Sequence, residues 1–78
     1  MPRYYFDITI NDLTKTDNEG IDLVHEQAAR REAVLTIAEI AAEEIPRDGS
    51  LLITINVRTE SDLALFRTRV HFEYGEPR

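Results

Sequence analysis

Three stretches of the chain alternate between apolar and polar residues, at 3–10, 50–58 and 63–74. Strict alternation is typical of a β-strand that buries one face. Aromatic and β-branched residues dominate the apolar positions, and such residues favour strands. The side chains predicted to face the core are Tyr4, Phe6, Ile8, Ile10, Leu51, Ile53, Ile55, Val57, Phe66, Thr68, Val70 and Phe72.

Two turns are predicted between the first strand and the middle of the chain. Asn11-Asp12 is suited to a tight turn, and residues 13–16 then form a short return strand. The return strand has little apolar content, so we expect it at an edge of the sheet. Asp17-Asn18-Glu19-Gly20 is the second turn. Ile21-Asp22-Leu23 leads from it towards a helix, with room for a little more extended pairing.

Residues 26–45 have helical periodicity. At about 100° per residue, Val34 lies at the centre of an apolar stripe that we expect to pack on the sheet. Its other members are Ile37, Ala38, Ala41 and Ile45, with Ala33 and Ile40 at one margin. Pro46 ends the helix, because proline disfavours helical geometry at the residue before it. Asp22 and His25 are both candidates for the N-cap.

Two side chains of this helix each have two interpretations. Leu35 lies about 100° from the stripe centre, and it either widens the core contact or belongs to a self-association surface. Arg30 lies about 40° from the centre. It either covers the edge of the core with its aliphatic stem or presents its guanidinium to an anion or a partner carboxylate.

The elements follow the order strand, strand, helix, strand, strand. This order predicts an α+β fold in which a four-stranded antiparallel sheet carries one helix across one face. Residues 1–78 are expected to form one domain, with a frayed tail at 75–78. The other face of the sheet would be uncovered.

The uncovered face is predicted to be basic and aromatic, and it supplies the candidate partner-binding residues. They are Arg3, Tyr5, Arg58, Leu65, Arg67, Arg69 and His71. Three interpretations are open. The arginines pair with Asp7 or Glu73 across strands on a solvated face, the face binds a second copy or another protein, or it binds single-stranded RNA with Tyr5 stacking on a base.

Composition narrows the choice of partner and setting. The net charge of −6 argues against general affinity for nucleic acid or anionic membrane, and it leaves basic proteins as partners. The chain has no cysteine, which excludes disulfides and thiolate chemistry. No apolar run approaches the roughly 20 residues that span a bilayer, and the opening Met1-Pro2-Arg3 is unlike a signal peptide. We therefore expect a cytoplasmic protein.

The sequence contains no pattern that predicts catalysis, a cofactor or a metal site. Asp17, Glu19 and Asp22 surround Gly20, but their spacing fits turn chemistry better than a calcium loop. The only two histidines, His25 and His71, belong to separate elements. No serine or threonine has an adjacent base, so nucleophilic catalysis has no support.

Several short motifs together resemble a known family. They are the opening Met1-Pro2-Arg3-Tyr4-Tyr5-Phe6, the turn at 17–20, the helix start at 28–33 and the strand end Val70-His71-Phe72. In combination they resemble a family of short, uncharacterised bacterial proteins that begin "MPRYFF", a domain of unknown function. Val24-His25 stands where that family more usually has a cap containing Asp. The resemblance covers most of the chain, and it implies the fold and a bacterial intracellular setting without implying an activity.

These observations favour a non-enzymatic accessory domain that binds a protein partner or a second copy, as a homodimer, through the open sheet face. The alternative is an acidic, antitoxin-like partner that neutralises a basic protein, a resemblance at the level of the fold only. Weak binding of single-stranded RNA on the sheet face is the third hypothesis.

Overall fold

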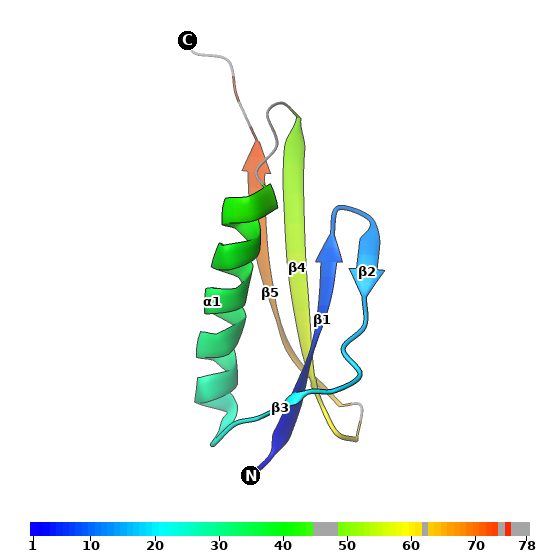
Figure 1. Ribbon diagram of the computed structural model, residues 1–78, viewed down its shortest axis with the longest axis vertical. Coiled ribbons are helices and arrows are strands. Elements are labelled where there is room, and N and C mark those ends of the chain that lie inside the picture. The colour runs from blue at the N-terminus through cyan, green and yellow to red at the C-terminus, as the bar shows by residue number, and fades with distance from the viewer. Residues whose placement is uncertain (45–48, 62, 74, 76–78) are drawn as a thin grey trace.

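One helix packs on one face of an antiparallel sheet (Figure 1) in the computed structural model, which describes residues 1–44, 49–61, 63–73 and 75. In chain order the elements are β1 (Arg3–Ile10), β2 (Leu13–Lys15), β3 (Ile21–Asp22), α1 (Glu26–Glu44), β4 (Ser50–Thr59) and β5 (Ala64–Glu73). The α+β fold class is confirmed. The sheet has five strands instead of four, because the short segment before the helix also pairs with β1. Ile45, Pro46 and all of the predicted frayed tail except Gly75 lie outside the described residues.

The strand order is β2-β1-β4-β5, and β3 also pairs with β1. All pairs are antiparallel. Because β4 occupies one edge of β1, β2 and β3 share its other edge. β2 lies opposite residues 8–10 and β3 lies opposite residues 3–4.

The predicted alternation of the strands is confirmed where it matters most, in β4. Ile53, Ile55 and Val57 are almost completely buried. Ile53 lies between Ile10 of β1 and Val70 of β5 in the sheet. From α1, the core receives small or medium side chains, namely Ala29, Ala33 and Ile37.

The helix is rotated relative to the sequence prediction. Val34, the predicted centre of the packing stripe, is 55% exposed, whereas Ala33 is fully buried. Ala38 is also exposed. Leu35 is 56% exposed, so its interpretation as a widened core contact is wrong. The physical reason is that apolar residues occur nearly all round this helix, and the alanine face allows its backbone to approach the sheet most closely.

The helix begins after His25, which settles the choice of N-cap. The amide of Ala28 donates to His25 Nδ1 at 3.2 Å and to the His25 carbonyl at 3.1 Å. Asp22 instead pairs with Arg3. His25 is thus the N-cap. Its ring nitrogen accepts the hydrogen bond that the side-chain oxygen of an Asp cap would accept.

Leu65 is not on the open face, so that placement was wrong. The register between β4 and β5 shifts at Val57/Arg58, where Val57 pairs with Phe66 and Arg58 with Ala64. Leu65 is therefore the extra residue of a bulge, and it packs against the core cluster. A simple alternation cannot anticipate a bulge, because one added residue reverses the facing of every residue beyond it.

The single helix does not cover the whole sheet. Its backbone lies close to β4 and β5 and farther from β1 (Figure 1). A helix is about 10–12 Å wide and strands lie about 4.8 Å apart, so one helix covers about two strands. Tyr4 and Phe6 of β1 still reach the core, but Ile8 and Ile10 of β1 and Leu13 of β2 are left at the margin.

Candidate interaction surfaces

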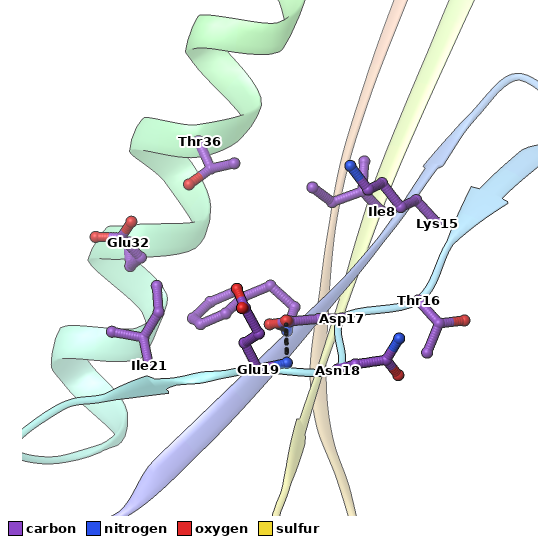
Figure 2. Close-up of a pocket in the computed structure, with 10 residues that line it drawn as sticks. Ile8, Lys15, Thr16, Asp17, Asn18, Glu19, Ile21, Glu32 and Thr36 are labelled. Atoms are coloured by element: carbon purple, nitrogen blue, oxygen red, sulfur yellow. Dashed lines mark hydrogen bonds between the residues drawn. The ribbon is translucent and has the colours of Figure 1, made fainter.

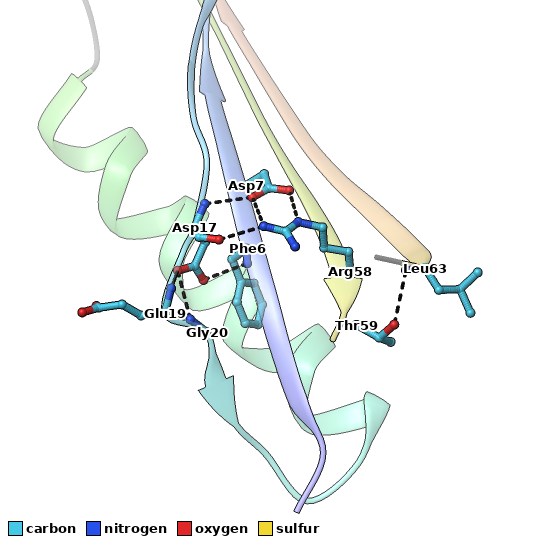
Figure 3. Close-up of polar contacts among 8 residues, drawn as sticks. All are labelled: Phe6, Asp7, Asp17, Glu19, Gly20, Arg58, Thr59 and Leu63. Carbon is cyan, nitrogen blue, oxygen red and sulfur yellow. Dashed lines mark hydrogen bonds and ion pairs between the residues drawn. The ribbon is translucent and has the colours of Figure 1, made fainter. Parts of the chain in front are cut away.

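The open face near β1 is occupied by the chain's own loop between β2 and β3. Asp17 organises this loop (Figure 3). Its Oδ1 accepts from the amides of Glu19 at 3.0 Å and Gly20 at 3.1 Å, and its Oδ2 accepts from the Phe6 amide at 3.0 Å. The predicted turn at 17–20 is confirmed, and its first residue closes the gap that β2 and β3 leave on the edge of β1.

Arg58 lies at the centre of a polar cluster with Asp7 and Asp17. Its Nε donates to Asp7 Oδ2 at 2.7 Å, and its Nη2 donates to the Asp17 carbonyl at 2.7 Å. The guanidinium also stacks on the Tyr5 ring, 4.7 Å from its centroid. The side chains of Arg58 and Asp7 are only 22% and 19% exposed, so this ion pair is part of the fold.

Both carboxyl groups of this cluster have lowered pKa values. Burial by itself raises the pKa of Asp7, but hydrogen bonds from Arg58 and the Asp17 amide outweigh burial and lower the pKa. Burial likewise raises the pKa of Asp17, and the amides of Gly20, Phe6 and Glu19 lower it by more. The folded state therefore favours both carboxylates in their charged form.

Arg3 is also held within the chain. It forms an ion pair with Asp22 at 3.1 Å and donates to the Glu19 carbonyl. Gly20 makes this close packing possible: its φ is 74°, and a Cβ there would lie 2.9 Å from Arg3 Cγ and 3.0 Å from the Tyr5 ring. Three of the predicted partner-binding residues are thus already in contact with other parts of the same chain, namely Arg3, Tyr5 and Arg58.

The remaining predicted residues form an exposed row on β5. Arg67, Arg69 and His71 are exposed and lie opposite Asn56, Thr54 and Leu52 of β4. Among the described residues, no ion pair involves Arg67 or Arg69.

Arg30, the predicted anion or partner contact, has two partners on its own chain. Its guanidinium lies 4.6 Å from the centroid of the Phe66 ring. It also pairs with Glu26 at 2.9 Å, one helical turn earlier. The geometry matches the interpretation in which its stem covers the core edge.

Sequence reasoning missed a groove between α1 and the first hairpin. It encloses about 560 Å³ (Figure 2). Phe6 and Ile8 line it from β1, Glu32 and Thr36 from α1, and Ile21 with residues 15–19 complete it. The signal that could have revealed it is the mismatch in width between one helix and the sheet.

A second hollow of about 330 Å³ adjoins the first and shares Ile8 and Lys15 with it. Its lining is almost entirely apolar and includes Ile10, Leu13 and Ile40, with Glu44 at one end. We call the two hollows together the hairpin groove.

The described residues contain no group of three or more His, Asp and Glu side chains placed to hold a metal. His25 is used as a helix cap, and His71 lies on β5. In the same described parts, no helix is long and apolar enough to cross a membrane.

A family model described as a domain of unknown function (DUF6894) matches residues 3–71. No curated protein and no solved structure matches the chain.

Proposed function

We propose that this chain, which belongs to the DUF6894 family of unknown function, is a non-enzymatic accessory domain that binds a basic protein segment in the hairpin groove. The observation that carries the proposal is the groove itself, an apolar floor left open beside a negatively charged helix flank. The proposal includes a bacterial cytoplasm as the setting.

The floor supplies the apolar part of the recognition. Ile8 and Ile10 are only partly buried although they face the helix side of the sheet. Leu13, next to them on β2, is 77% exposed, and Ile21 is 41% exposed. Adjacent apolar side chains that the chain leaves uncovered mark a binding surface more often than scattered ones do.

The rim supplies the electrostatic part. Glu19, Glu32 and Glu44 line the groove, against one cation, Lys15. The chain as a whole carries a net charge of −6. Complementary charge steers association and selects the partner, so the groove fits a segment with apolar residues on one side and Lys or Arg on the other.

The mode of binding follows from the edge of β1. That edge already pairs with β2 and β3, and Asp17 accepts the Phe6 amide between them. A partner cannot add a strand there, and it has to bind through side chains, as an amphipathic helix in a groove does. An antitoxin-like role, in which the domain masks a basic protein, is the specific form of this function that the acidic rim favours.

The open sheet face supports partner binding less well. Three of its predicted contact residues are used inside the chain, and Arg58 covers the Tyr5 ring that RNA would need for stacking. The hairpin groove has no such internal occupant among the described residues.

A fluorescently labelled amphipathic helical peptide of Leu and Lys tests the proposal. We expect saturable binding by anisotropy, with no binding of the matched Leu and Glu peptide. Leu13→Asp and Glu32→Lys should each weaken binding at least about tenfold, which corresponds to about 1.4 kcal/mol. Arg67→Glu, on the far edge of the sheet, is the control and should not weaken it. The proposal would be wrong if both peptides bound equally. It would also be wrong if Arg67→Glu lost binding while Leu13→Asp and Glu32→Lys kept it.

A further inference from the structure

The edge of β5 differs from every other strand edge of the sheet. β5 has ten residues and pairs with β4 on one side; no described residue pairs with its other side. The opposite side of the sheet ends instead in two short strands, β2 and β3, and Asp17 accepts the Phe6 amide between them. A long unpaired edge strand presents a row of amides and carbonyls that is ready to pair with another chain.

An apolar helix flank lies beside this edge. Arg30 contacts Phe66 of β5, whereas Glu32 and Thr36 line the hairpin groove on the β1 side. These contacts orient α1: its acidic flank faces β1, and the flank that continues from Arg30 through Val34 and Ala38 faces β5. We call this second side the β5 flank. Val34 and Ala38 are both exposed there.

We infer that a second copy of this chain docks on the β5 edge, so that two β5 strands pair antiparallel about a twofold axis and two β5 flanks meet. Such a contact is self-complementary, as a twofold interface must be. It joins two sheets into one and places both helices on the same side. The inference is independent of the groove proposal, because the β5 edge and the hairpin groove lie on opposite sides of α1.

The spacing of the two helices fits direct contact. α1 packs on β4 and β5, so its axis lies about one strand spacing, 4.8 Å, from a twofold axis at the edge of β5. The two helices would then be about 10 Å apart, and packed helices lie about 8–10 Å apart. The small side chain of Ala38 permits that approach.

The charged side chains of β5 favour one position of the twofold axis along the strand. An axis through Thr68 would place Arg67 opposite Arg69 of the second copy, which is repulsive. An axis through Val70 places Arg67 opposite Glu73 of the second copy, twice by symmetry, with Arg69 opposite His71 and Val70 opposite itself.

The helix agrees with the same axis. α1 and β5 run in the same direction (Figure 1). Ala38 lies about 12 Å along the helix from Arg30, and Val70 lies about 13 Å along the strand from Phe66, which Arg30 contacts. Ala38 and Val70 are therefore level, and an axis through Val70 brings the two helices together at the level of Ala38.

Charge exchange tests the pairing. In sedimentation equilibrium we expect the chain to dimerise and Arg67→Glu to weaken the dimer about tenfold, because two attractive pairs become repulsive. The double variant Arg67→Glu/Glu73→Arg should restore the dimer, and Leu13→Asp should leave it unchanged. A chain that stays monomeric at every concentration, or a dimer that the single charge reversal does not weaken, would overturn the inference.

Cysteine crosslinking tests the position, since the natural chain has no cysteine. Under mild oxidation, Ala38→Cys should give a disulfide-linked dimer at protein concentrations where Leu13→Cys does not. Far-UV circular dichroism checks that each variant is folded. If Leu13→Cys formed the disulfide-linked dimer and Ala38→Cys did not, the interface would lie on the β2 side of the sheet, and the inference would be wrong.

Discussion

At the scale of single residues, Asp17 does more for this fold than its place in a polar turn indicates. Its carboxylate accepts three backbone amides, and its carbonyl accepts from Arg58. The sequence predicted the turn correctly. It could not show that the turn folds back onto β1, because Phe6 and Arg58 are distant from Asp17 in the chain.

The lowered pKa values of Asp7 and Asp17 make stability depend on pH. A carboxyl whose pKa is lower in the folded state stabilises the fold above its unfolded pKa, about 3.9, and loses that contribution as pH falls through the folded pKa. We therefore expect the urea midpoint to be level near neutral pH and to fall progressively below about pH 5.

Asp17→Asn is the variant that separates this effect from general acid unfolding. It should cost about 1–3 kcal/mol at pH 7, because Asn has one acceptor oxygen where Asp17 uses two, so either the Phe6 amide or the Glu19 and Gly20 amides lose their acceptor. Its midpoint should also depend less on pH. Asp12→Asn, in the exposed turn after β1, is the matched control. Identical pH profiles for Asp17→Asn and the natural chain would contradict the assignment.

At the scale of elements, the helix shows how weakly periodicity can determine rotation. Apolar residues cover most of α1, and the face that packs combines Ala29 and Ala33 with Ile37. The strands are different, because a strand side chain has only two possible sides, and Leu51, Ile53, Ile55 and Val57 of β4 all lie on one of them.

Two alanines of α1 provide a direct check of the helix rotation. Ala33 is fully buried and Ala38 is exposed. Ala33→Leu should destabilise the fold by about 1–3 kcal/mol through overpacking, whereas Ala38→Leu should change stability by less than about 0.5 kcal/mol. Urea unfolding in an Arg67→Glu background, where self-association is weakened, gives both values. A larger loss from Ala38→Leu would restore the Val34-centred stripe.

At the scale of the whole molecule, one helix is too narrow to cover the whole helix-side face of the sheet. The hairpin groove remains beside one flank of α1, and the open edge of β5 remains beside the other. Small domains bury a low fraction of their surface and gain most from association. Because these two surfaces are separate, the proposed groove partner and the proposed second copy would not compete for one site.

Self-association predicts that thermal stability rises with protein concentration, because a dimer stabilises the folded chain by mass action. We expect the Tm of the natural chain to increase over a concentration series spanning the dimer dissociation constant. Arg67→Glu should flatten that dependence, and Leu13→Asp should keep it. Differential scanning calorimetry measures all three, and a flat series for the natural chain would count against the dimer.

The sequence by itself determined the order of the elements, the facing of β1 and β4, and the turn at 17–20, since these depend on neighbours along the chain. Tertiary structure decided the rotation of α1, the bulge that turns Leu65 inward, and the contacts that hold Arg3, Tyr5 and Arg58 within the chain. Each of these depends on contacts between distant segments. The hairpin groove and the open edge of β5 were also decided by tertiary structure, because both remain where one helix is narrower than the sheet it covers.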